Sequence, residues 1–141
     1  MSATQLAALA RTSDPRTMLR RFLALDAVVT GANGVAYLAA SGPLGDLFGV
    51  DATLLLILGA FLAAFAAGVG LLAARPHPAA LPVRLVVEAN LAWAALSLLA
   101  LALWLTPSTA GAVWTVLQAL TVAGFAGLQH MSLRARQDIS S

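Results

Sequence analysis

Eight arginines and no lysine supply the positive charge of this chain, and they fall in three clusters that alternate with four long apolar stretches. The first cluster ends with Arg20 and Arg21, Arg75 and Arg84 flank the gap between the second and third stretches, and Arg134 and Arg136 follow the fourth. The other two gaps contain no basic residue. Because basic residues near membrane spans are retained on the cytoplasmic side, this pattern predicts four spans with both termini in the cytoplasm.

The predicted fold is an all-α membrane protein, a four-helix antiparallel bundle. With 60% hydrophobic and 10% charged residues and a mean hydropathy of +0.88, the composition is typical of integral membrane proteins. Each stretch has the roughly 20 residues that a helix needs to cross about 30 Å of hydrocarbon. We predict a cytoplasmic segment over 1–21, a transmembrane domain over 22–133 and a cytoplasmic tail over 134–141, with spans at 22–40, 53–74, 84–105 and 111–133.

Composition also excludes several classes of function. The absence of Cys rules out disulfides, thiolate metal sites and cysteine nucleophiles. A basic pI could suggest nucleic acid, but the net charge is only +2 and the arginines lie at the ends of spans. We therefore expect Arg20, Arg21, Arg75, Arg84, Arg134 and Arg136 to set the topology and to contact anionic headgroups of the lipid bilayer, with no nucleic-acid partner and no cofactor.

The connectors contain helix-start and helix-stop signals. Asp14-Pro15 and Asp51 are predicted to begin the helices of the first and second spans. Three prolines make 75–82 a stiff connector without helix, and 106–109 is a tight turn whose hydroxyl groups cap the fourth span. Gaps this short place successive helices antiparallel and adjacent.

Polar residues of the first span lie on one helical face, since Asp26, Thr30, Asn33 and Tyr37 are spaced by four, three and four. Lipid cannot satisfy such groups, so the face should point into the bundle. Two interpretations stay open. The face either lines a path for a proton, an ion or a small molecule, or it joins helices by hydrogen bonds, and the second is favoured.

The third and fourth spans add polar faces of their own. Asn90, Trp93, Ser97 and Trp104 share one face, and Trp114, Gln118 and Gln129 share another, with His130 off that face. His130 has no second ligand at a metal-binding spacing, so no metal site is predicted.

Asp26 and Glu88 each lie about one turn inside the membrane boundary. We expect Glu88 to pair with Arg84, and Asp26 to pair with Arg84, Arg75 or Arg134. A carboxylate without such a partner could instead carry protons.

The second span has small residues in place of polar ones, with Ala60, Ala64 and Gly68 at intervals of four and Gly59, Ala63 and Ala67 beside them. Small residues at this spacing allow close helix approach. Tight packing within the bundle is favoured over a homodimer contact.

The run from Leu25 to Gly34, LDAVVTGANG, together with length and topology, resembles small uncharacterised four-span bacterial membrane proteins and is loosely similar to the DoxX-like group. The resemblance implies a four-span bundle. DoxX-like proteins are associated with redox and quinone partners, but the shared layout is too general to transfer that role or any site residue.

Two functions follow as hypotheses. The first is a non-enzymatic accessory protein of the inner membrane that binds a lipophilic ligand against its tryptophans or a membrane protein partner. The alternative is a small homodimeric transporter or proton-coupled carrier whose path is lined by Asp26, Asn33, Glu88 and Gln118. No nucleophile, acid–base pair or metal cage predicts an enzyme, although a non-catalytic subunit of a redox complex stays open.

Overall fold

A computed structural model describes the backbone of residues 14–140 and the side chains through residue 138. The described part of the chain is all helical, as the sequence predicts. In chain order the helices are α2 (Pro15–Ala39), α3 (Ser41–Phe48), α4 (Ala52–Ala74), α5 (Ala80–Leu103) and α6 (Thr109–Ser140). Predictions for residues 1–13 and 141 lie outside the described residues.

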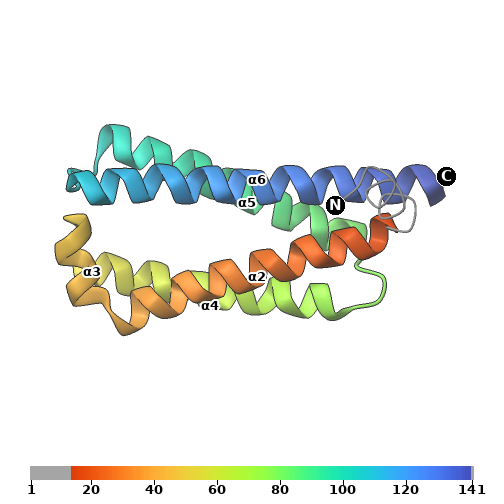
Figure 1. The fold of residues 1–141 in the computed structure, drawn as a ribbon, viewed down its shortest axis with the longest axis horizontal. Helices are drawn as coiled ribbons and strands as arrows, with labels where there is room; N and C mark the ends of the chain where they lie inside the picture. Colours follow the sequence, from red (N-terminus) through yellow and green to blue (C-terminus); the bar gives the residue numbers. More distant parts are fainter. Residues whose placement is uncertain (1–13, 141) are drawn as a thin grey trace, which may run out of the picture.

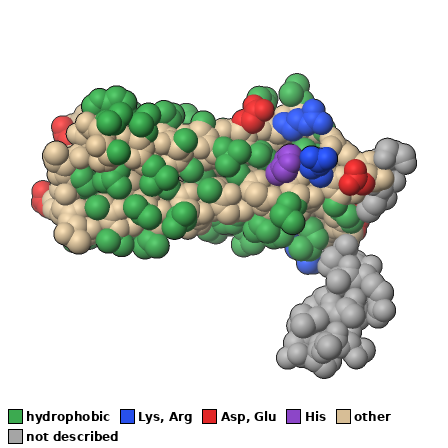
Figure 2. Space-filling view, turned by 90° about the horizontal axis from the view of Figure 1, so that it is seen from above, with side chains coloured by type: hydrophobic (Ala, Val, Ile, Leu, Met, Phe, Trp, Pro, Cys, Tyr) green, Lys and Arg blue, Asp and Glu red, His purple; other side chains and the backbone are tan. Residues whose placement is uncertain are grey.

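Four of these helices are long and apolar enough to cross a membrane. The shortest, α4, has 23 residues, which at 1.5 Å per residue is about 35 Å and exceeds the hydrocarbon thickness of a bilayer. Their outward faces carry many exposed leucines and valines. Figure 2 shows basic side chains gathered at one end of the molecule, with hydrophobic side chains over the rest of that face. The chain is therefore a multi-pass membrane protein.

The predicted helix starts are confirmed. Asp14 accepts a hydrogen bond from the Arg16 backbone N–H at 3.1 Å, and Asp51 accepts one from the Thr53 N–H at 2.9 Å. Ser108 does the same for α6, where its Oγ accepts from the Gly111 N–H at 3.1 Å. Each side chain satisfies a backbone donor that the first helical turn leaves without a partner.

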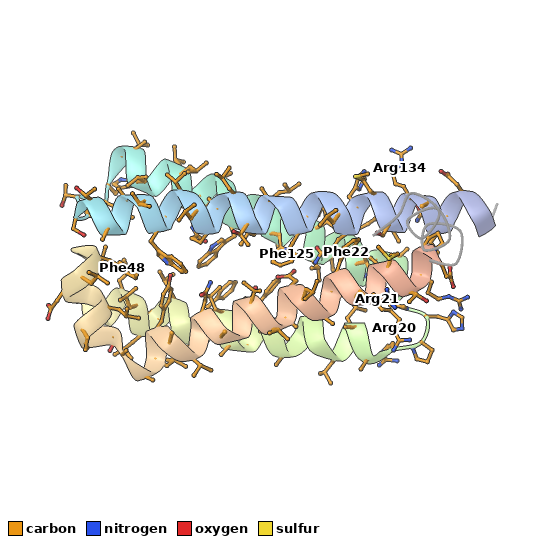
Figure 3. The ribbon with its side chains drawn as sticks, viewed as in Figure 1. Arg20, Arg21, Phe22, Phe48, Phe125 and Arg134 are labelled. Atoms are coloured by element: carbon orange, nitrogen blue, oxygen red, sulfur yellow. The ribbon has the colours of Figure 1, made fainter. Side chains whose placement is uncertain are left out.

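The helices form two antiparallel hairpins, α2 with α4 and α5 with α6 (Figure 1). The hairpins meet mainly through α2 and α6, whereas α4 and α5 barely touch. The start of α2 and the end of α6 lie at the same end of the bundle (Figure 1), here called the arginine end. The opposite end, which carries α3, is called the α3 end (Figure 3 labels Arg20, Arg21 and Arg134 at the first and Phe48 at the second).

Close approach of α2 and α4 depends on two glycines. A Cβ on Gly34 would lie 2.8 Å from the Ala63 backbone nitrogen, and one on Gly59 would lie 2.9 Å from the Gly34 carbonyl oxygen. Tight packing within the bundle therefore uses the Gly59–Ala63 side of α4. The other small-residue face, formed by Ala60, Ala64 and Gly68, is exposed.

The connectors differ from the prediction in two places. Residues 41–48 form the short helix α3, which ends at Gly49 in the left-handed conformation (φ 69°). The connector after Arg75 is shorter than predicted because α5 begins at Ala80 and contains Pro82 in its first turn, where a missing N–H costs nothing. Similarly, α6 continues without a break beyond residue 133 to Ser140.

The two ends of the bundle are packed differently. At the arginine end, a hydrophobic cluster joins both hairpins and contains Leu19, Leu23, Val69, Leu72, Ala73, Val83, Val86 and Leu133. At the α3 end, the Ser108 N–H donates to the Phe48 carbonyl at 2.9 Å, and a Cβ on Gly111 would clash with the same oxygen. Between these two contact regions, the interior of the bundle is not completely filled by side chains.

Candidate functional site

The polar face of α2 points into the bundle, as the spacing predicts. Asp26 is fully buried, Thr30 and Tyr37 are buried, and Asn33 is half-buried. The face runs along the boundary between the hairpins, so its side chains meet residues of both α5 and α6.

Asp26 is the centre of a buried hydrogen-bond network. Its Oδ1 accepts from the Thr30 hydroxyl at 2.9 Å. Its Oδ2 accepts from the Asn90 amide of α5 and the Gln129 amide of α6, both at 2.8 Å. The Asn90 amide also donates to Gln129 Oε1 at 3.2 Å. The network thus joins three spans, and every side chain that donates to Asp26 is neutral.

The predicted pairing of Asp26 with an arginine is therefore wrong. Arg84 and Arg134 are exposed, since a long guanidinium side chain reaches water more cheaply than it enters the interior. Glu88 is also exposed, and within the described part of the chain it makes no salt bridge with Arg84. At Asp26, amide and hydroxyl donors take the place of the expected arginine.

Several predicted residues lie outside the interior. Glu88 and His130 line a surface groove of about 530 Å³ at the arginine end, together with Arg84 and Arg134. Arg20 joins two helices, because its Nε donates to the Ala73 carbonyl at the end of α4 at 3.0 Å, where a cation complements the helix dipole. Similarly, Arg136 donates to the Pro78 carbonyl.

Two further hydrogen bonds lie nearer the α3 end. The Trp114 indole donates to the Tyr37 hydroxyl at 2.6 Å, which links α6 to α2. The Trp93 indole donates to Gln118 Oε1 at 2.8 Å, which links α5 to α6. Gln118 in turn donates to the Thr115 carbonyl at 3.0 Å. These four side chains form a wall across the interior, which we call the Trp–Gln wall (Tyr37, Trp93, Trp114 and Gln118).

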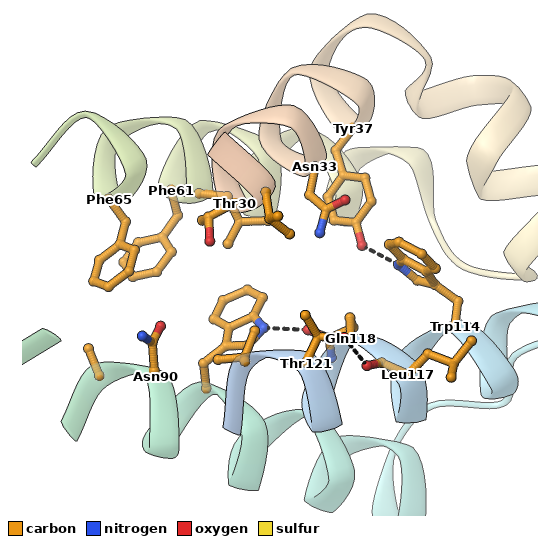
Figure 4. Close-up of a pocket in the computed structure, with 15 residues that line it drawn as sticks. Thr30, Asn33, Tyr37, Phe61, Phe65, Asn90, Trp114, Leu117, Gln118 and Thr121 are labelled. Carbon is orange, nitrogen blue, oxygen red and sulfur yellow. Dashed lines mark hydrogen bonds between the residues drawn. The ribbon is translucent and has the colours of Figure 1, made fainter. Parts of the chain in front are cut away.

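A cavity lies on each side of this wall, and all four wall residues line both cavities. The smaller, of about 120 Å³, reaches towards the Asp26 network and is lined by Thr30, Asn33 and Asn90 among others. The larger, of about 360 Å³, reaches towards α3 and is lined mainly by leucines and aromatic residues, with Ser97 on α5. Figure 4 shows Asn33 and Tyr37 facing Asn90 and Gln118 across the smaller cavity.

Aromatic rings contribute much of the lining. Phe61 of α4 stacks on Trp93 of α5 with centroids 5.8 Å apart and planes 6° apart. Phe48 stacks in the same manner on Trp114, at 5.9 Å and 5°. Phe65 lies beside Phe61 (Figure 4). Trp104, expected beside the other two tryptophans, is instead 69% exposed on the lipid side.

Sequence reasoning missed the contribution of α4, which we described only by its small residues. The signal is present in retrospect, because Phe61 and Phe65 are one helical turn apart and therefore share a face. Nothing in the sequence indicates that this face is opposite Trp93, since that depends on how the two hairpins pack.

The site is therefore a pair of adjoining cavities at membrane depth that share the Trp–Gln wall as lining. The buried Asp26 carboxyl lies behind the smaller one, hydrogen-bonded to Thr30 and Asn90 of its lining. No charged side chain is among the described residues that line either cavity. Comparison with known protein families, with curated proteins and with solved structures finds no match for this chain.

Proposed function

We propose that this protein binds a lipophilic molecule in the two cavities between its hairpins, and that it acts as a non-enzymatic accessory protein of the inner membrane. The observation that carries the proposal is the pair of adjoining cavities inside a membrane bundle, lined by leucines and stacked aromatic rings. A packed interior gains dispersion contacts that an unfilled space of this size lacks. An apolar occupant restores them.

The composition of the lining supports binding over catalysis. Ligand sites are mostly apolar with a few polar groups that fix orientation, and here these groups are amides and hydroxyls from Asn33, Tyr37, Asn90 and Gln118. Placement of the arginine end in the cytoplasm is part of the proposal and rests on the positive-inside rule.

Native mass spectrometry of protein extracted gently from its own host membrane tests this function. We expect a reproducible additional mass of lipophilic character that is retained at low collision energy. A protein that is consistently free of any adduct, under conditions that preserve lipid adducts on a control membrane protein, would contradict the proposal.

A second candidate, a homodimeric proton-coupled carrier, is favoured by the geometry at Asp26. Oδ2 accepts two amide hydrogen bonds, whereas Oδ1 meets only the Thr30 hydroxyl. A hydroxyl can donate or accept, so Oδ1 can take up a proton without leaving a broken hydrogen bond. The exposed face of Ala60, Ala64 and Gly68 offers a surface for a second copy.

Flux in proteoliposomes distinguishes this candidate. Asp26→Asn keeps the shape of the network but removes the titratable group, so a carrier would lose proton-coupled flux. Glu88→Gln serves as the matched control, because Glu88 is exposed and outside both cavities. Equal flux in wild type and Asp26→Asn would eliminate the carrier.

A further inference from the structure

The two cavities differ in polarity, and this difference indicates what kind of molecule they hold. Among the residues that line the larger cavity, Ser97 and Thr115 are the hydroxyl-bearing side chains beyond the Trp–Gln wall. The smaller cavity, at one third of the volume, is bordered by Thr30, Asn33, Asn90 and Thr121 in addition to that wall. An amphiphile placed along both cavities would therefore have its polar head in the smaller one.

Three residues of the smaller cavity have hydrogen-bonding capacity that is unused within the described part of the chain. Asn33 makes no hydrogen bond with its amide, and Asn90 uses its Nδ2 but not its Oδ1. Tyr37 accepts from Trp114, which leaves its own hydroxyl proton unused. Every described side-chain nitrogen or oxygen that is fully buried has a partner, so the Asn33 amide and Asn90 Oδ1 reach open space, and both residues and Tyr37 line the smaller cavity. They offer both donors and an acceptor to an occupant.

The lining also limits the charge and size of the head. Transfer of an unpaired charge into such a site is strongly unfavourable, and no described lining residue carries a countercharge. A volume of about 120 Å³ is slightly below the 150 Å³ cavity that accommodates benzene in a well-studied protein. The head is therefore uncharged and no larger than a single six-membered ring.

The aromatic neighbours favour a ring over a linear head. The stacked pair of Phe61 and Trp93 lines the smaller cavity, and Figure 4 shows Phe61 and Phe65 opposite Asn90 across that cavity. Flat aromatic faces pack well against another ring in an offset or edge-on arrangement.

We propose that the ligand is an uncharged amphiphile whose head is a single hydroxyl-bearing ring. This inference rests on the proposed function and specifies its ligand class. The head hydroxyl accepts from the Tyr37 hydroxyl and donates to the amide oxygen of Asn33, one turn earlier on α2. The hydrocarbon chain passes the Trp–Gln wall into the larger cavity, among Leu54, Leu58 and Leu96.

Three probes that share a ring and a ten-carbon chain test this assignment: 10-bromodecylbenzene, 4-(10-bromodecyl)phenol and 4-(10-bromodecyl)benzoate. Bromine at the chain end quenches tryptophan fluorescence on contact. A Trp104→Phe background removes the exposed tryptophan, so that Trp93 and Trp114, which line both cavities, report binding. We expect saturable quenching, with the phenol bound tightest and the benzoate weakest.

Comparison between variants removes the effect of membrane partitioning, which is the same for each probe whatever the variant. Asn33→Val and Tyr37→Phe should each reduce the preference for phenol over benzene about fivefold, the usual effect of one hydrogen bond of about 1 kcal/mol. Thr53→Val is the matched control, since Thr53 is exposed on α4 and lines neither cavity, and it should leave the preference unchanged.

The outcomes separate this inference from the proposed function. Saturable quenching with no preference for the phenol, or a preference that survives both variants, would overturn the ligand class while leaving the binding function in place. Absence of saturable quenching by all three probes would overturn the binding function itself and this inference with it. Continued binding of the benzene probe by Asn33→Val and Tyr37→Phe establishes that these variants are folded.

Discussion

At the scale of single residues, Asp26 accepts hydrogen bonds from three side chains. Its carboxylate is fully buried and is the acceptor for amide groups from two other helices. Since lipid offers no replacement partner, the response to substitution depends on whether the new side chain can still accept from Asn90 and Gln129.

Asp26→Leu should lower the free energy of unfolding by about 1–3 kcal/mol, because it leaves the buried Gln129 amide without an acceptor and removes one of the two acceptors of the Asn90 amide. Asp26→Asn should stay within about 1 kcal/mol of wild type, since its oxygen can serve both amides and its NH₂ can donate to Thr30. The measurement is equilibrium unfolding in mixed micelles, followed by tryptophan fluorescence. Asp46→Leu, at an exposed position of α3, is the control and should change little. Equal stability of Asp26→Leu and Asp46→Leu would contradict the role of the network.

The sequence predicts which residues of α2 face inward but not what they bind. Helical periodicity is a local property, so the shared face of Asp26, Thr30, Asn33 and Tyr37 follows from spacing alone. The hydrogen bonds of Asp26 with Asn90 and Gln129 depend on how the two hairpins are aligned along each other. No local sequence pattern predicts that alignment. The arginine expectation failed because it considered charge and not the preference of long basic side chains for water.

At the scale of helices, the contact between α2 and α4 depends on the absence of side chains. Gly34 and Gly59 face each other's backbones, and such close contact supplies the dispersion energy that holds membrane helices together. In contrast, a Cβ on Gly68 would meet nothing within 4 Å.

Gly34→Ala should therefore destabilise the protein by about 1–3 kcal/mol, the usual cost of overpacking, because the helices must move apart. Gly68→Ala is the matched substitution on the exposed face and should be neutral or stabilising by up to about 1 kcal/mol, since Ala favours helix over Gly. Unfolding of both variants by SDS titration in bicelles measures the difference. Similar midpoints for the two variants would show that the α2–α4 contact is looser than described.

Helix α3 illustrates why element boundaries are harder to predict than spans. The sequence of 41–48 contains two glycines and Pro43, which normally indicate a connector. However, Pro43 is the third residue of the helix, where its missing N–H has no intrahelical acceptor. Gly49 then ends the helix in the left-handed conformation that glycine adopts without strain.

At the scale of the whole molecule, the arrangement of the hairpins has a testable orientation. Arg20, Arg21 and Arg134 share one end of the bundle, and α3, which contains Asp46, lies at the other (Figure 3). Because the chain contains no cysteine, single introduced cysteines report sidedness without background. A membrane-impermeant maleimide should label Asp46→Cys in intact cells and Gln137→Cys only after lysis. The opposite pattern would invert the proposed topology.

The cavities are a property of the whole molecule and were not predictable. They exist because the hairpins are packed together by the hydrophobic cluster at the arginine end and by backbone contacts at the α3 end, while α4 and α5 barely touch. No single span contains a signal for that space.

Retention of a lipophilic adduct by a matched pair of variants tests the central claim most directly. Ala100 lines the larger cavity, whereas Ala102, two residues along the same helix, is exposed. Native mass spectrometry of Ala100→Phe and Ala102→Phe, extracted from the host membrane as for wild type, measures adduct occupancy. The account predicts that Ala100→Phe loses most of its adduct because the ring fills the cavity, and that Ala102→Phe retains it. Equal occupancy in the two variants would mean that the adduct is bound elsewhere and would contradict the account.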